Sequence, residues 1–384
     1  MRFSVDAHAI GQHLTGNETY IRNLLKCFAT IDQESEFVTY VSRASAFSEI
    51  PERFHKRRVA ENPYVRLCLD LPRKLRQDRP DLLHVQYTAP LFCSVPLVVS
   101  VHDVSFLEHP EFFTSFRALQ LRWTVRRTVR RAVRVITGSE FSKRSILRAY
   151  GLDDSKVIVL PNAVSSAFRP VSREGAQRWI FQRFGLPSPF ILTVADLQPR
   201  KNHLTLIAAF EELLRAHPQI PHHLVLVGKE TWYSPVVKSA AARSVAADRI
   251  HFTGFVSDEE LLRFYGACDL FVQPSFYEGF GLPILEAMAC SRAVACSNTS
   301  AMPEVADSAA LLFDPRSRTE IVRAMADLLL DSELRARMER LGAHRATLFS
   351  WEDSASRTLD IYYQIADQAR SRPSPSVKTA SMAR

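Results

Sequence analysis

Short runs of β-branched and aliphatic residues alternate with longer helical segments along most of this 384-residue chain. Such alternation is typical of parallel α/β domains, in which each helix returns the chain to the same end of a sheet. The expected strands of the first half are 2–5, 82–85, 97–101, 133–137 and 157–160. Those of the second half are 190–195, 223–227, 250–253, 270–273, 293–296 and 310–313.

The length of the chain favours two domains over one. A polar segment over residues 165–174 separates the two series of strands. We therefore expect an N-terminal domain over residues 1–168 and a C-terminal domain over residues 175–351. Residues 370–384 are rich in serine, proline and basic side chains, so we predict a disordered tail there.

Composition is that of a globular protein, with 46% hydrophobic residues. No apolar run reaches the roughly 18 residues that a membrane span needs, and the first residues do not have the pattern of a signal peptide. The six cysteines show no C-x-x-C pairing, which predicts buried free thiols and a cytoplasmic protein.

Positive charge is concentrated in the first half of the chain, although the whole protein carries a net charge of +8. The densest cluster is the segment 113–134, from Phe113 to Arg134, where arginines recur at helical spacing between large apolar residues. One interpretation is a packed helix with a solvated basic face. The other is a peripheral contact with an anionic membrane surface. No nucleic-acid-binding motif accompanies the charge, so we expect no nucleic-acid partner.

The segment 275–286 joins a predicted buried strand, 268–274, to a predicted helix, 283–289. Gly279 and Gly281 lie in the connecting turn, where a missing Cβ lets backbone N–H groups approach a ligand closely. The N-terminus of the following helix favours anions, above all phosphate.

Two carboxylates flank this anion site, Glu278 before the turn and Glu286 about one turn into the helix. Carboxylates only accept hydrogen bonds, so the pair suits a ligand with hydroxyls on both sides of a phosphate, such as a sugar nucleotide. Alternatively, Glu278 caps the helix and Glu286 faces solvent.

Cationic and polar residues follow two other predicted strands. Arg200 and Lys201 come after the strand 190–195, and Asn202 is expected to cap the next helix. A cationic pair beside a positive helix end is unfavourable unless an anion such as a diphosphate shares the site; the alternative is a solvated loop. His102 follows the strand 97–101, at a strand end where a doubly wound sheet places ligands; the alternative is a core residue.

Several common motifs are absent from the sequence. It contains no Asp-x-Asp pair to hold a divalent metal, no dinucleotide fingerprint, no P-loop and no hydrolase elbow. We therefore expect no cofactor and no metal, and we expect Arg200, Lys201 and backbone N–H groups to neutralise a bound diphosphate.

The segment 275–286 resembles the E-x7-E signature of family 4 glycosyltransferases, which have the GT-B fold. Other segments resemble the same family, in particular its mannosyltransferase-like bacterial branch, in the same order along the chain. They are T-G-N-E-T-Y from Thr15, V-H-D from Val101, S-E-F-S-K from Ser139, P-N-A-V from Pro161, P-R-K-N from Pro199, G-F-V-S-D-E-E-L from Gly254 and A-M-P-E-V-A from Ala301.

This resemblance implies two Rossmann-like domains facing across a cleft, with a helix at about 352–368 packing back on the first domain. It implies a retaining transfer of a hexose from a nucleotide-diphosphate sugar, GDP-mannose or a UDP-hexose, to a glycan or lipid-linked acceptor. Relatives often build lipid-linked glycans at the cytoplasmic face of the membrane. A surface polysaccharide or glycolipid would be the product.

Residue roles also follow from the resemblance. His102 and Glu278 are expected at the reaction centre, with Asp103 orienting His102, and Glu286 is expected on the ribose diol. The sugar and phosphates would contact Lys201, Arg200, Gly279, Phe280, Gly281 and Leu282. Gly16 matches the glycine-rich loop of the family, whereas Asn17 stands where many relatives have glycine. Acceptor-side candidates are His84, Gln86 and Tyr87.

Two alternatives use similar donor contacts. A sugar-nucleotide epimerase or phosphorylase could share the two-domain plan. A non-catalytic sugar-nucleotide binder is disfavoured because the carboxylates, the cationic pair and His102 occur together in one chain.

Overall fold

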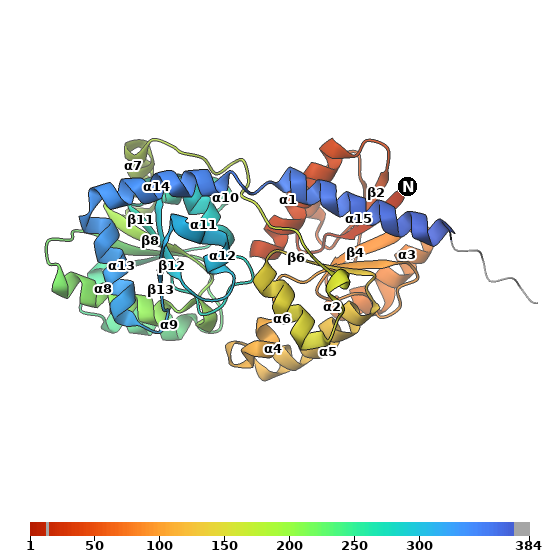
Figure 1. The fold of residues 1–384 in the computed structure, drawn as a ribbon, viewed down its shortest axis with the longest axis horizontal. Coiled ribbons are helices and arrows are strands. Elements are labelled where there is room, and N and C mark those ends of the chain that lie inside the picture. The colour runs from red at the N-terminus through yellow and green to blue at the C-terminus, as the bar shows by residue number, and fades with distance from the viewer. Residues whose placement is uncertain (13–14, 372–384) are drawn as a thin grey trace, which may run out of the picture.

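The computed structural model describes residues 1–12 and 15–371, so most of the predicted tail lies outside the described residues. The described chain forms two α/β domains that lie side by side, each built on a parallel sheet (Figure 1). The long C-terminal helix α15 (Trp351–Ser371) runs back along the N-terminal domain (Figure 1).

The N-terminal sheet has seven parallel strands in the order β3-β2-β1-β4-β5-β6-β7. Five of them match the predicted strands to within one residue at each end. The other two, β2 and β3, were not predicted, and the sequence of β3 is His-Lys-Arg-Arg, without an apolar residue. The strands are β1 (Arg2–Asp6), β2 (Glu36–Val41), β3 (His55–Arg58), β4 (Leu82–Gln86), β5 (Leu97–Ser100), β6 (Arg134–Thr137) and β7 (Val157–Val159).

The C-terminal sheet has six parallel strands in the order β10-β9-β8-β11-β12-β13, and all six were predicted to within one residue at each end. These strands are almost continuously apolar, which is typical of a parallel sheet that is buried on both faces. The strands are β8 (Phe190–Val194), β9 (His223–Val227), β10 (Ile250–Gly254), β11 (Leu270–Gln273), β12 (Ala293–Ser297) and β13 (Leu311–Phe313).

Helices cover both sheets and connect successive strands. In the N-terminal domain they are α1 (Thr15–Ile31), α2 (Pro63–Val65), α3 (Leu71–Asp78), α4 (Ser105–Glu108), α5 (Ser115–Arg131) and α6 (Glu140–Tyr150). In the C-terminal domain they are α7 (Arg173–Phe184), α8 (His203–Ala216), α9 (Ser234–Arg243), α10 (Asp258–Ala267), α11 (Leu282–Ala289), α12 (Met302–Ala306), α13 (Arg318–Leu330) and α14 (Ser332–Ala346). The predicted linker overlaps the start of α7.

Helix α15 belongs to the core of the N-terminal domain although it ends the described chain. Its Tyr362 is fully buried and hydrogen-bonds Nδ1 of His84, whose Nε2 contacts the hydroxyl of Ser100 at 2.7 Å. His84 is therefore a core residue, and its assignment to the acceptor side is wrong. The helix also runs three residues past the predicted end, since Arg370 bonds Asp81 at 3.1 Å.

Two general expectations can be compared with the structure. All six cysteines are free, as predicted, but Cys68 is exposed while the other five are buried. Within residues 1–12 and 15–371, no helix is long and apolar enough to cross a membrane.

Candidate active site

A cleft of about 1,060 Å³ lies between the two domains, at the carboxyl ends of their strands. Ligands bind there in parallel α/β folds, because strand ends from several βα units meet at that edge. The cleft is lined by every residue predicted for the site: Gly16, Asn17, His102, Asp103, Arg200, Lys201, Glu278, Gly279, Phe280, Gly281, Leu282 and Glu286.

Glu278 is the centre of a buried polar cluster. Its Oε1 accepts hydrogen bonds from Nζ of Lys201 at 2.6 Å, Oγ of Ser275 at 2.7 Å and Nε2 of Gln273 at 2.8 Å. Its Oε2 accepts from Nη1 of Arg200 at 3.1 Å. Glu278 thus holds both cations, and Oε2 keeps capacity for a further donor such as a sugar hydroxyl.

The charges of this cluster follow from burial and proximity. Burial alone would raise the pKa of Glu278, but the charges of Lys201 and Arg200 lower it to about 2. The pKa of Lys201 is also lowered, by burial and then by Arg200, while Glu278 opposes that change. The lowered pKa of Glu278 favours its charged form, whereas the lowered pKa of Lys201 disfavours its charged form, so the two shifts disagree about an ion pair. The 2.6 Å contact decides between them, and we treat both groups as charged.

The cationic pair lies in a single 3-10 turn, Pro199–Lys201, directly before α8. The prediction that Asn202 caps this helix by its side chain is wrong. Asn202 adopts a left-handed conformation with φ of 58°, and its amide donates to the carbonyls of Pro274 and Pro315 at 3.0 and 2.8 Å. It thereby ties the turn that carries Arg200 and Lys201 to the loop that carries Glu278.

The turn between β11 and α11 contains the two predicted glycines. Gly281 has φ of 102°, a conformation that L side chains rarely adopt, and leads into α11 with Pro283 in its first turn. A Cβ on Gly279 would overlap the carbonyl oxygen of His102 and come within 2.9 Å of Cβ of Asp103. In this structure Gly279 therefore permits a close contact between the two domains, in addition to the predicted approach of a ligand to the backbone.

The contact at Gly279 is reinforced by helix α6 of the N-terminal domain. The hydroxyls of Ser139 and Ser142 donate to the carbonyl of Gly279 at 2.7 and 3.0 Å. Glu304 of α12 accepts from the first two backbone amides of α6, those of Glu140 and Phe141, at 2.8 and 3.1 Å. A carboxylate at a helix N-terminus is favourable, so these bonds hold the domains together at the cleft.

Glu286 lies on α11 and faces the cleft, buried to 8% exposure. Its Oε2 accepts from the hydroxyl of Tyr265 at 2.8 Å. Burial raises the pKa of Glu286 to about 7, with a smaller opposing effect of the Tyr265 hydrogen bond. The expectation that this side chain belongs to the site, and not to the solvent face of the helix, fits its position.

His102 lies at the opposite wall of the cleft. Its Nε2 contacts Oε1 of Gln86 at 2.9 Å, and its ring packs edge-on against Tyr20 with centroids 4.7 Å apart. Burial lowers the pKa of His102 to about 4, so the ring is neutral at pH 7. Asp103 does not orient it as predicted, because its carboxylate accepts from the backbone and hydroxyl of Ser105 at 2.9 and 2.6 Å. Gln86 has that role.

Comparison with known proteins supports the sequence resemblance. The model of the family "Glycosyltransferase Family 4" matches residues 14–168, and that of "Glycosyl transferases group 1" matches residues 178–345. O-antigen chain mannosyltransferase B of Escherichia coli is 32% identical over 266 residues, which are 69% of this chain and 69% of that protein. The chain belongs to family 4 of the glycosyltransferases.

Two further comparisons describe the extent of this likeness. The glycosyltransferase is 30% identical to the serotype-specific mannosyltransferase WbdA of Escherichia coli over 244 residues, which are 62% of this chain but 30% of that longer protein. Sucrose-phosphate synthase from Thermosynechococcus elongatus has the same fold, with a TM-score of 0.80 at 20% identity, over 96% of this chain and all of that one. The predicted GT-B fold is confirmed.

The predicted glycine-rich loop of the glycosyltransferase is helical in this structure. Gly16 and Asn17 lie in the first turn of α1 and line the cleft. A Cβ on Gly16 would meet no atom within 4 Å, so nothing in the ligand-free protein requires glycine there. The following Glu18 is tied to Gly11 N at 3.0 Å and to Arg22 at 2.6 Å.

Sequence reasoning missed one cluster in the cleft of the glycosyltransferase. His8 and Arg66 line it, and both face Asp6 at the carboxyl end of β1, at 3.0 and 4.0 Å. Burial would raise the pKa of Asp6, but His8 and Arg66 lower it to about 2. Asp6 and His8 come directly after the first predicted strand, and this position could have assigned them to the cleft. Arg66 lies far along the chain from that strand, and no sequence pattern indicated that the two would be in contact.

The basic segment 113–134 contains helix α5, whose arginines divide into two groups. Arg127 and Arg131 donate to backbone carbonyls of Leu91 and Cys93, so they fasten a loop of the domain. The other group comprises Arg117, Arg122, Arg126 and Arg130, which are exposed to solvent, as Arg131 also is. Three large apolar side chains on the same helix are also exposed by 63–69%, namely Phe116, Leu119 and Trp123.

Proposed function

We propose that this glycosyltransferase moves a hexose from a nucleotide-diphosphate sugar to a glycan or lipid-linked acceptor in the synthesis of a surface polysaccharide or glycolipid. GDP-mannose is the first donor to test, because the relative that is 32% identical is named as a mannosyltransferase. UDP-hexoses are the second choice. The observation that carries the proposal is the buried cluster of Glu278, Lys201 and Arg200 in a cleft lined by both domains.

The donor would lie along the C-terminal wall of the cleft. Arg200 and Lys201 would take the diphosphate, together with backbone N–H groups at the start of α11. Glu286, whose Oε2 alone has a partner among the described residues, would accept from the ribose hydroxyls. Oε2 of Glu278 would accept from a hydroxyl of the sugar. The base would then extend toward the carboxyl ends of β8 and β9, where Val194, Val227 and Gly228 line the cleft.

The proposed reaction keeps the configuration at the anomeric carbon. The acceptor oxygen attacks that carbon on the face from which the diphosphate leaves, the bond from carbon to the diphosphate oxygen breaks, and the acceptor proton passes to the departing diphosphate. Negative charge grows on the diphosphate, and fixed cations stabilise it most in that state. Arg200 and Lys201 supply this stabilisation, so we propose that no metal is needed. His102, neutral and held by Gln86, would hydrogen-bond the reacting sugar.

The test is product analysis with purified protein, a panel of donors and a lipid-linked or glycan acceptor. We expect a new glycoside and one equivalent of free nucleoside diphosphate. A nucleotide sugar with altered configuration would indicate an epimerase, and a sugar phosphate would indicate a phosphorylase. In the active combination, Lys201→Ala should reduce kcat/KM on the order of 10²-fold, because it removes one fixed donor to the leaving group. Lys238→Ala, on the exposed surface of α9, is the matched control.

We also propose that α5 places the acceptor side of the cleft on an anionic membrane surface, at the cytoplasmic face. The support is the coincidence of exposed apolar side chains, Phe116 and Trp123 among them, with exposed arginines on one helix. The protein should sediment with phosphatidylglycerol vesicles at low salt and dissociate as salt is raised. Phe116→Ser with Trp123→Ser should abolish sedimentation. Equal recovery with neutral vesicles would contradict the electrostatic part of this proposal.

A further inference from the structure

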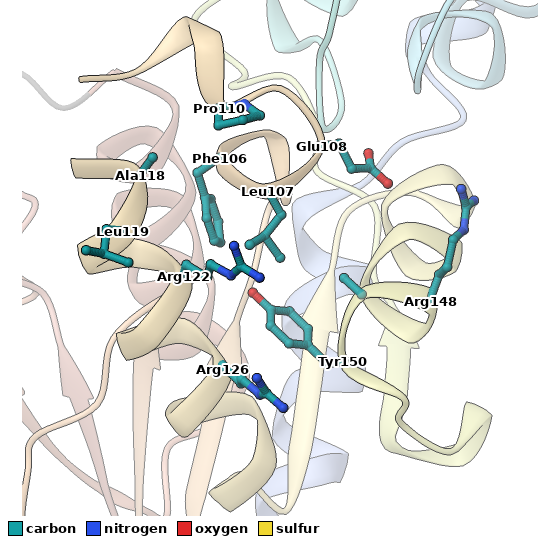
Figure 2. A pocket seen from close by; sticks show the side chains of 11 residues that line it. Phe106, Leu107, Glu108, Pro110, Ala118, Leu119, Arg122, Arg126, Arg148 and Tyr150 are labelled. Atoms are coloured by element: carbon teal, nitrogen blue, oxygen red, sulfur yellow. The ribbon is translucent and has the colours of Figure 1, made fainter. Parts of the chain in front are cut away.

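A second pocket, of about 570 Å³, lies in the N-terminal domain between α4, α5 and α6 (Figure 2). One side is apolar, formed by Phe106, Leu107, Pro110, Ala118 and Leu119. The other residues that line the pocket are Glu108, Arg122, Arg126, Arg148, Ala149 and Tyr150. The proposed sugar transfer uses none of their polar groups.

Three arginines line this pocket from two helices. Arg122 and Arg126 lie one turn apart on α5, and Arg148 stands on the opposite wall, on α6 (Figure 2). In the described part of the chain none of the three has a hydrogen bond or an ion pair. The one acid that lines the pocket is Glu108, and its Oε2 already accepts from the hydroxyl of Tyr277 at 2.9 Å. With three arginines against one carboxylate, the lining of the pocket has a net positive charge.

Tyr150 provides an independent indication of a ligand. Its side chain is 6% exposed, yet its hydroxyl has no hydrogen-bond partner among the described residues. Burial raises the pKa of Tyr150, so the hydroxyl stays protonated and can donate. The hydroxyl points into the pocket toward Arg122 (Figure 2). Buried hydroxyls are nearly always hydrogen-bonded, so an unpaired one beside Arg122, in a pocket lined by two further arginines, is suited to an anion that bonds the hydroxyl and a guanidinium group.

We propose that this pocket, whose Phe106 and Leu119 also border the cleft, binds the phosphate group of a phosphorylated organic ligand at a site distinct from the donor site. Guanidinium groups match the geometry of phosphate oxygens, and the hydroxyl of Tyr150 adds a neutral donor from the floor. The apolar side offers contact to the body of the ligand, which can be a soluble sugar phosphate or the glycerol and acyl part of a phospholipid. Both kinds of ligand carry a phosphate group, and binding to vesicles distinguishes them.

The primary experiment counts bound pyrophosphate by equilibrium dialysis on the full chain. Relative to wild type, Arg122→Gln/Arg126→Gln/Arg148→Gln should lose one bound equivalent. Arg130→Gln/Arg144→Gln is the control, since both arginines are exposed on α5 and α6 but do not line the pocket. Lys201→Ala should remove pyrophosphate binding at the donor site and leave the pocket unaffected. The Lys201 variant therefore tests the donor site, and the triple arginine variant tests the pocket.

Tyr150→Phe provides a sharper test, because it removes only the unpaired oxygen. Pyrophosphate affinity at the pocket should fall on the order of 10-fold, which corresponds to one hydrogen bond to a charged group. The melting temperature of the ligand-free variant should not fall, since the hydroxyl has no partner to lose. Unchanged pyrophosphate binding in the triple arginine variant, compared with the control, would overturn the proposal.

Vesicles distinguish the two ligand sources. If the ligand is a lipid phosphate, the protein should float with vesicles that contain phosphatidic acid, pyrophosphate should compete, and Tyr150→Phe should weaken flotation. If the ligand is soluble, Tyr150→Phe should weaken pyrophosphate binding and leave flotation unchanged. Both results support the pocket, and they assign its ligand.

Discussion

The pairing of Lys201 with Glu278 leads to a quantitative prediction about stability. The ordinary pKa of 4.5 and the shifted pKa of about 2 differ by an amount that corresponds to about 3 kcal/mol. This is the net stabilisation of the charged Glu278 side chain, after the opposing effect of burial. Because the pKa in the folded state is lowered, the stabilisation is present above pH 4.5 and is lost as the pH falls toward 2.

Two cations share this stabilisation, and Lys201 is closer, at 2.6 Å against 3.1 Å for Arg200. We therefore expect a coupling energy of about 2 kcal/mol between Lys201 and Glu278, which lies within the range for residues in one buried network. Lys201→Ala alone should lower the free energy of unfolding, since it leaves the buried carboxylate of Glu278 with one cation in place of two. Lys201→Ala combined with Glu278→Gln should recover part of the loss.

The assay is a double-mutant cycle of these two changes at pH 7. Free energies of unfolding would come from urea denaturation, followed by circular dichroism and by tryptophan fluorescence, whose midpoints must agree for the cycle to be valid. Lys238→Ala combined with Glu278→Gln is the control pair and should be additive. A coupling energy below about 0.5 kcal/mol between Lys201 and Glu278 would refute the buried ion pair.

Three further predictions concern the cleft. Turnover should persist in excess EDTA, because fixed cations replace a metal; loss of turnover that magnesium or manganese restores would contradict this. The pKa of Glu286 is raised to about 7, so its ionisation should reduce stability as the pH rises from 4.5 to 7, by about 3 kcal/mol, and Glu286→Gln should remove that dependence in urea unfolding. Gly279→Ala should reduce turnover strongly, because its Cβ forces the domains apart, while nucleotide binding, measured by calorimetry, stays within a few-fold.

Local patterns in the sequence determined the secondary structure and the location of the site. Eleven of the predicted strands lie within one residue of the observed ends, since a buried parallel strand reads as an apolar run. The polar residues that follow those strands line one cleft, because parallel strands all end at the same edge of a sheet. Strand β3 escaped prediction because its residues are polar.

Only the tertiary structure determined which groups meet. Lys201 and Arg200 pair with Glu278 across 77 and 78 residues of sequence, and His102 is held by Gln86 and not by its neighbour Asp103. The carbonyl of His102 requires glycine at position 279 only because the two domains dock there. Such contacts depend on how separately formed elements pack. Neighbouring residues fix the backbone conformation of a segment, but they carry no information about which distant side chain satisfies a buried charge or hydroxyl.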